Sequence, residues 1–155
     1  MPFKPAARTR EPATAMKPLV DPAGWTSQEL AASTDWIYEL SPAEQDDIRS
    51  AVARIEKQKL SILDIIRTDF PLPVFDAGLQ MMYDELLEGR GFCLIRGVPV
   101  ENFSKQQAAI AFWGIGTRFG TALSQNIKGH MLGHVKALGV SYTDQLVRGY
   151  QTADE

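Results

Sequence analysis

The only two histidines of the chain, His130 and His134, lie four residues apart in the segment KGHMLGHVK. In a helix, residues at positions i and i+4 share a face, and two imidazoles placed there could bind one metal ion. A helix is disfavoured because Gly129 and Gly133 would each cost about 1 kcal/mol in its interior. The segment also lacks the glutamate of an H-E-x-x-H motif, and two imidazoles are fewer ligands than a zinc or iron site needs.

A strand fits this segment better, because apolar residues stand among small and polar ones. Two residues four apart on a strand share a face, but at ~3.3 Å per residue they are about 13 Å apart. Zinc–nitrogen bonds are only about 2.0–2.1 Å long, so one ion cannot reach both histidines. We therefore expect two hydrogen-bonded histidines on a sheet face. A histidine that lines a substrate site is an alternative, and a metal site is the least favoured interpretation.

Composition excludes several protein classes. The 155 residues are 45% hydrophobic and 23% charged, as in an ordinary globular domain, and no stretch approaches the ~18 apolar residues of a membrane span. The net charge of −3 does not suggest a nucleic-acid binder. The lone cysteine, Cys93, lies in an apolar run, so we expect a buried, unreactive thiol and a reducing, cytoplasmic location.

The N-terminal segment, residues 1–24, contains five prolines and few large apolar residues. Its first 18 residues carry four basic side chains against one acidic side chain. This composition predicts a flexible, basic arm, with a transit peptide as the alternative. Residues 25–155 form the predicted domain, which begins with a short element over residues 25–40.

The clearest helix start is at residues 41–58, where Ser41 suits the N-cap, Pro42 the first helical position and Glu44 a capping box. The apolar residues that follow at helical spacing are Ile48, Val52 and Ile55. A second helix is expected to restart at Ser61, with Asp64 repeating the cap pattern, and to end before two prolines.

A further amphipathic helix is expected over residues 76–91, ended by its two glycines. Its predicted core residues are Leu79, Met82, Tyr83, Leu86 and Leu87. A buried strand is predicted within residues 91–100, and another helix within residues 104–120. The predicted core residues of that helix are Ala108, Ile110, Ala111, Phe112 and Ile115.

Strands are expected after Gly120, over residues 121–126, 130–138 and 146–152. Helices followed by strands indicate an α+β fold. So few strands can neither close a barrel nor cover both faces of a sandwich, and would leave open edges. The sequence therefore predicts the first half of a larger α+β domain.

Three segments carry a resemblance to a known family: GRGFCLIRGVPV, AFWGIGTRFGTALSQNIKGHMLGHV and VRGYQT. They resemble the N-terminal half of TauD/TfdA-type dioxygenases, which depend on Fe(II) and 2-oxoglutarate, over about residues 71–155. The resemblance implies N-terminal helices followed by the first strands of a double-stranded β-helix (jelly-roll), which would be incomplete in this chain. Arg96, near the end of a predicted strand, is expected to be structural.

The resemblance also implies where the iron ligands belong. The family binds iron through a His-x-Asp/Glu pair and a distal histidine, and the pair follows shortly after the strand that matches RGYQT. This sequence contains no His-x-Asp or His-x-Glu. By resemblance, neither His130 nor His134 is an iron ligand. The chain is expected to hold no catalytic or metal-binding residue, and neither Fe(II) nor 2-oxoglutarate is expected to bind to it alone.

Two polar segments match parts of the family near the active site. The first, a candidate substrate-binding segment or a simple polar turn, is Ser124, Gln125 and Asn126. The second is expected to lead into the metal-binding loop and to lie around the iron ligands without binding the iron itself. It consists of Tyr150, Gln151 and Thr152.

Three functions are consistent with these observations. The favoured one is the N-terminal fragment of a dioxygenase that oxidises a small organic substrate, inactive by itself. The alternative is a non-catalytic interaction protein that completes its sheet with a partner, or forms a homo-oligomer, by β-augmentation. The third is an independent metal protein built around His130 and His134. Neither a nucleic acid nor a membrane is an expected partner.

Overall fold

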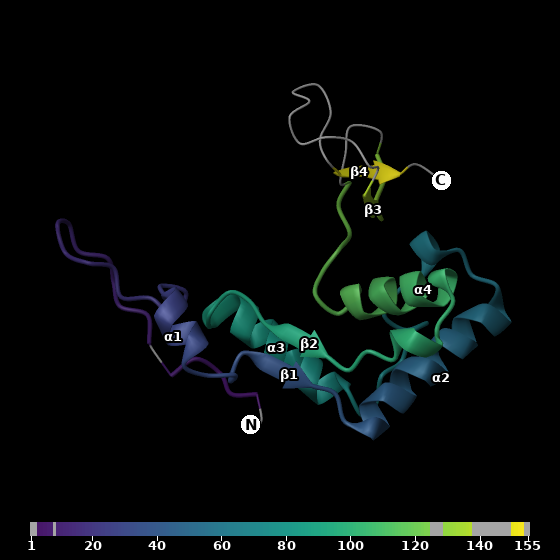
Figure 1. Cartoon of the computed structure of the whole chain (residues 1–155), viewed down its shortest axis with the longest axis horizontal. Helices are drawn as coiled ribbons and strands as arrows, with labels where there is room; N and C mark the ends of the chain where they lie inside the picture. The colour runs from purple at the N-terminus through teal and green to yellow at the C-terminus, as the bar shows by residue number, and fades with distance from the viewer. Residues whose placement is uncertain (1–2, 8, 125–128, 138–149, 154–155) are drawn as a thin grey trace. The chain divides into compact units, whose positions relative to one another are not determined.

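The computed structural model describes residues 3–7, 9–124, 129–137 and 150–153. The chain divides into two compact units, Met1–Phe119 and Gly120–Glu155 (Figure 1). The described helices all belong to the first unit, together with a short parallel sheet. The second unit contains an antiparallel pair of strands.

Helix α2 (Pro42–Gln58) confirms the strongest sequence prediction. The Ser41 side chain accepts a hydrogen bond from the Glu44 amide, and the Glu44 carboxylate accepts one from the Ser41 amide, which completes the capping box. The three predicted core residues, Ile48, Val52 and Ile55, are at most 1% exposed. The helix ends where Lys59 adopts the left-handed conformation.

Helix α4 (Lys105–Gly116) is also confirmed, with a capping box between Ser104 and Gln107. Its core prediction was wrong for Phe112, which is 70% exposed, whereas Ile110 and Ala111 are buried. Because most positions of this helix are apolar or small, the sequence pattern does not single out its buried face. Packing decided the face, and it placed Ile110 rather than Phe112 in the core.

Residues 61–70 do not restart a long helix, contrary to the sequence prediction. They form only the short 3₁₀ helix η1 (Ile62–Asp64), and Ser61 makes no side-chain capping bond. The segment instead brings Ile65 and Phe70 into the core, with 2% and 0% exposure. Continuing the helix would forfeit this burial, so tertiary packing overrides the local capping signal.

Helix α3 (Asp76–Glu88) ends at Gly89, as predicted. Leu79 and Met82 face the core, Tyr83 and Leu86 are half-buried, and Leu87 is exposed, contrary to prediction. The unexpected occupant of the buried face is the charged residue Glu85. Upstream, residues 25–40 contain the short helix α1 (Ser27–Ala31), capped by Thr26.

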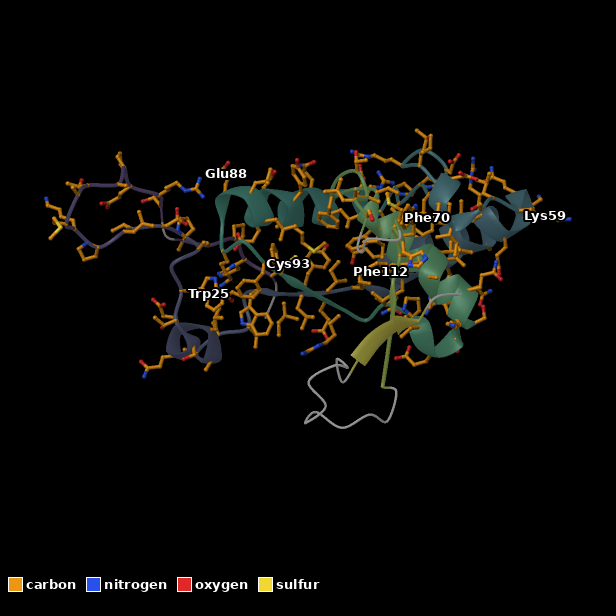
Figure 2. All side chains as sticks on the ribbon, turned by 90° about the horizontal axis from the view of Figure 1, so that it is seen from above. Trp25, Lys59, Phe70, Glu88, Cys93 and Phe112 are labelled. Carbon is orange, nitrogen blue, oxygen red and sulfur yellow. The ribbon has the colours of Figure 1, made fainter. Side chains whose placement is uncertain are left out.

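Strands β1 (Ile37–Glu39) and β2 (Leu94–Arg96) form a two-stranded parallel sheet, with Tyr38 paired to Ile95. The predicted strand in residues 91–100 is therefore present, but it is not buried, because Leu94 is 42% exposed. The sheet packs on the core through Tyr38 and Ile95. Adjacent positions of a strand face opposite sides, so Leu94 lies on the other face. The largest core side chains include Phe75 and Phe70, of which Phe70 is labelled in Figure 2.

The second unit contains β3 (His134–Ala137) and β4 (Tyr150–Ala153), paired antiparallel. The strands expected in residues 130–138 and 146–152 are thus confirmed over these residues. Thr121–Ser124 form no strand, contrary to prediction, and Gln125 and Asn126 lie outside the described residues. The jelly-roll fold stays a prediction. Among the described residues, no helix is both long and apolar enough to cross a membrane.

Candidate functional site

Tyr150, Gln151 and Thr152, the polar segment predicted to lead into a metal-binding loop, lie in strand β4. The register pairs Tyr150 with Ala137, Gln151 with Lys136 and Thr152 with Val135. Neighbouring positions of a strand alternate between its two faces, so positions 150 and 152 share one face of the hairpin and position 151 takes the other. The structure therefore gives these three residues a common strand but not a common face.

The two histidines do not share one element. His134 begins β3, opposite Ala153, whereas His130 precedes the strand. Gly129, next to His130, has φ of 86°, a left-handed conformation that favours glycine. The strand interpretation is confirmed for His134, and the described residues around His130 form no helix.

The proposed substrate segment is only partly described. Ser124 is exposed and lies in no strand, while Gln125 and Asn126 fall outside the described residues. Substrate contact and a simple polar turn both stay open interpretations for this segment.

The described residues do not fit an iron centre. A facial triad needs two histidines and a carboxylate around one ion. Among residues 3–7, 9–124, 129–137 and 150–153, no group of three or more histidine, cysteine, aspartate or glutamate residues lies close enough to share a metal.

A buried polar contact links β1 to α2. The Tyr38 hydroxyl donates a 2.6 Å hydrogen bond to Glu44 Oε1, while Glu44 Oε2 accepts hydrogen bonds from the Ser41 amide and hydroxyl. Burial and the neighbouring carboxylate raise the pKa of Tyr38 to about 12. Burial opposes ionisation of Glu44, but these hydrogen bonds outweigh it and lower the Glu44 pKa. Near neutral pH, Tyr38 is therefore protonated and Glu44 is ionised. This hydrogen-bonded pair is suited to a structural role, because it links β1 to α2.

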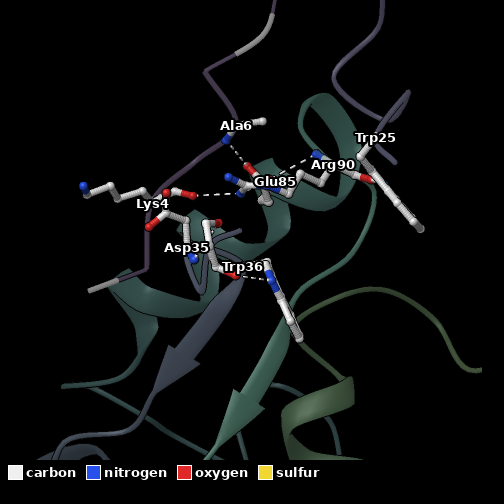
Figure 3. A network of polar contacts seen from close by, with 8 residues as sticks. Lys4, Ala6, Trp25, Asp35, Trp36, Glu85 and Arg90 are labelled. Atoms are coloured by element: carbon white, nitrogen blue, oxygen red, sulfur yellow. Dashed lines mark hydrogen bonds and ion pairs between the residues drawn. The ribbon is translucent and has the colours of Figure 1, made fainter. Parts of the chain in front are cut away.

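A second buried carboxylate, Glu85 of α3, holds the N-terminal arm (Figure 3). Glu85 Oε1 accepts hydrogen bonds from the Arg90 amide, at 3.0 Å, and from Arg90 Nη1, at 2.7 Å. Glu85 Oε2 accepts one from the Ala6 amide, at 2.9 Å, and Arg90 Nη1 also donates to the Lys4 carbonyl. Phe3 is buried against Tyr38, with ring centroids 5.6 Å apart. Residues 3–6 therefore pack against β1 and the C-terminal end of α3, and the flexibility of residues 1–24 stays a prediction.

Cys93 is half-buried rather than fully buried. Burial, together with the nearby Glu85 carboxylate, raises the pKa of its thiol. A thiol that stays protonated is a weak nucleophile, so the environment of Cys93 is consistent with the unreactive role predicted from the sequence.

Local sequence patterns did not predict the tertiary hydrogen bonds of the two buried carboxylates, Glu44 and Glu85. Glu44 was identified as a capping residue, but nothing in the local sequence indicated its bond to Tyr38. Glu85 occupies a core-facing position of α3, at helical spacing from Met82, and that placement was the available signal. An acidic residue in a predicted apolar stripe calls for a buried cationic partner, and here the partner is Arg90.

Two curated proteins are similar to this chain, whereas no family model matches it. The FR-33289 synthase of Streptomyces rubellomurinus is 27% identical over 137 residues, which are 88% of this chain and 40% of that protein. A taurine hydroxylase-like protein of Stachybotrys chartarum is 24% identical over 102 residues, 66% of this chain and 26% of that protein. The chain thus matches less than half the length of either relative. Both relatives are similar at low identity, and the name of the second, a taurine hydroxylase-like protein, agrees with the TauD/TfdA-type resemblance of the sequence.

Proposed function

We propose that residues 25–155 are the N-terminal part of an Fe(II)/2-oxoglutarate-dependent dioxygenase that oxidises a small organic substrate. The observation that carries this proposal is the match to the FR-33289 synthase. The match covers 88% of this chain but only 40% of that much longer protein. The taurine hydroxylase-like relative supports the same chemistry, because its name denotes a hydroxylase. The cytoplasmic location belongs to the proposal as well.

The iron ligands lie outside residues 1–155 in this proposal. The sequence has no His-x-Asp or His-x-Glu, and the described residues offer no three-ligand cluster. When bound, iron and 2-oxoglutarate would supply the oxidising chemistry of the whole enzyme. The chain by itself would then bind neither and would be inactive.

The contribution of this chain is a scaffold and part of a substrate surface. Helices α2, α3 and α4 share one apolar core, which gives a rigid support. In the proposal, Ser124–Asn126 contact substrate through hydroxyl and amide groups. Tyr150–Thr152 support the metal loop that would follow.

The decisive experiment starts with the gene. We would sequence past the codon for Glu155, express the chain alone and with any in-frame continuation, and titrate each with Fe(II) and 2-oxoglutarate under anaerobic conditions by calorimetry. The proposal expects a continuation with a His-x-Asp/Glu motif, and binding by the longer protein only. Tight uptake by the 155-residue chain, abolished by His130→Ala, would instead support an independent metal protein.

A stop codon directly after Glu155 would favour the non-catalytic alternative, in which a partner or a second copy completes the sheet. Size-exclusion chromatography then separates the cases. A monodisperse species with a cooperative melt would support the interaction protein, and aggregation would support a fragment.

A further inference from the structure

A surface groove of about 710 Å³ runs along α2, and none of its lining residues is among the candidate site residues named above. One wall is a stripe of α2 and the other is the turn after η1. The lining residues are Asp47, Ser50, Ala51, Arg54, Lys57, Gln58, Pro71 and Pro73. At 1.5 Å per residue, the stripe from Asp47 to Gln58 is about 16 Å long. That is the length of about five residues of extended peptide.

The two walls are held together by direct bonds, so the groove exists before any ligand binds. Asp47 Oδ2 accepts hydrogen bonds from the amides of Val74, at 2.6 Å, and Phe75, at 3.0 Å. Leu72 and Phe75, which flank Pro73, are at most 1% exposed and anchor the turn in the core. A preformed groove lowers the conformational cost of binding.

The acidic side chains of α2 all have hydrogen-bond partners, whereas two of its basic side chains have none among the described residues. Every carboxylate of the helix has a partner: Glu44 binds Tyr38, Asp46 binds Arg49, Asp47 binds two amides and Glu56 binds Gln107. Arg54 and Lys57 make no hydrogen bond or ion pair within the part of the chain that the structure describes. Both line the groove. The end of the groove that Arg54 and Lys57 line is therefore cationic, although the net charge of the whole chain is −3.

The groove is lined by both apolar and polar residues. Pro71 and Pro73, which are both exposed, offer apolar surface, while Ser50 and Gln58 add polar groups beside the two cations. Sites for small molecules enclose most of their ligand, whereas this groove is long and open along the helix. We propose that the groove binds an extended, acidic segment of a partner protein, with an apolar side chain against Pro71 and Pro73 and carboxylates at Arg54 and Lys57.

The first test uses fluorescein-labelled Asp-Asp-Leu-Asp-Asp and fluorescence anisotropy at low salt. The full 155-residue chain should bind this peptide more tightly than Asn-Asn-Leu-Asn-Asn, which lacks charge, and Asp-Asp-Gly-Asp-Asp, which lacks the apolar side chain. Added salt should weaken the interaction. Absence of binding, or equal binding of all three peptides, would overturn the proposal.

Variants then locate the site. Arg54→Gln and Lys57→Gln should each weaken binding by roughly 2- to 5-fold, as expected for exposed ion pairs. Lys59→Gln is the matched control, because Lys59 is an exposed cation just beyond α2 that does not line the groove. Ser50→Trp should block the groove and abolish binding. An equal loss for Lys59→Gln, or none for Ser50→Trp, would contradict the assignment.

A competition experiment separates a peptide from a small anion. Succinate, at a carboxylate concentration equal to that of the peptide, should leave the peptide bound. Displacement by succinate would overturn the peptide proposal and indicate a simple anion site. Neither result depends on whether the chain belongs to a dioxygenase.

Discussion

The Tyr38 hydroxyl lies 2.6 Å from Glu44 Oε1 and donates a hydrogen bond to it, which ties strand β1 to the first turn of α2. The same carboxylate closes the capping box with Ser41. One side chain therefore joins a local helix start to a contact between two elements. A Cβ added at Gly78 of α3 would overlap the Tyr38 ring, so α3 also fixes where the hydroxyl points.

Glu44→Gln tests the charge of this contact. The folded-state pKa of Glu44 lies below its ordinary value, so its ionisation stabilises the fold above the unfolded-state pKa of about 4.3. That contribution is lost as pH falls through the folded pKa. We expect Glu44→Gln to cost about 1 kcal/mol at pH 7, and the difference from wild type to shrink below about pH 4. Urea unfolding across this range measures it, with exposed Glu101→Gln as the unaffected control. A difference that does not vary with pH would contradict the charge-dependent role.

The Tyr38 phenol should titrate late. Its pKa is raised to about 12, so the neutral phenol favours folding below the unfolded pKa of about 10, and this stabilisation is lost as pH rises through about 12. The difference in phenolate absorbance between wild type and Tyr38→Phe should have a midpoint near 12. A midpoint near 10 would show that the hydroxyl is not held by Glu44.

Two glycines of α4 should respond in opposite directions to alanine. A Cβ at Gly114 would overlap the ring of the fully buried Phe70, whereas a Cβ at Gly116 would meet nothing within 4 Å. Gly114→Ala should therefore destabilise the fold by about 1–3 kcal/mol through overpacking. Gly116→Ala should be neutral or stabilise it by up to about 1 kcal/mol. Thermal melts of both variants compare them directly, and equal effects would exclude this packing.

Glu85→Ala should destabilise the fold strongly. It leaves Arg90, whose side chain is 14% exposed, without its buried carboxylate, at a cost of about 3–5 kcal/mol. Limited proteolysis should also cut the arm faster, because the Ala6 amide loses its acceptor. Glu88→Ala is the matched control on the same helix. The Glu88 side chain is 77% exposed, so its loss should barely move the unfolding midpoint. Similar midpoints for the two variants would contradict the role of Glu85.

Cys93 should react slowly while the chain is folded. Burial and Glu85 raise its pKa, which lowers the thiolate fraction available to an alkylating reagent. Iodoacetamide at pH 8 should modify the native chain at least ~10-fold more slowly than the chain in urea. Equal rates would show that the thiol is neither shielded nor perturbed.

The sequence by itself determined the elements whose signals are local. The Ser41 and Ser104 helix starts and the Gly89 helix end were all predictable, because capping depends on residues within one turn. The strands around Leu94, His134 and Tyr150 were also found, since apolar runs between glycines are a local pattern. The resemblance to dioxygenases was likewise carried by contiguous motifs, and the two relatives support it.

Tertiary structure alone decided which faces are buried and which polar groups meet. Phe112 and Leu87 fit an apolar stripe but point outward, because the neighbouring elements cover other sides of α4 and α3. The pairing of Glu85 with the amide of Ala6 spans 79 residues, and Arg118 reaches the Phe70 carbonyl across 48. Contacts over such distances along the chain depend on how elements pack, and no local pattern encodes them. The groove beside Arg54 and Lys57 exists for the same reason, since its second wall comes from a turn that only packing brings to α2.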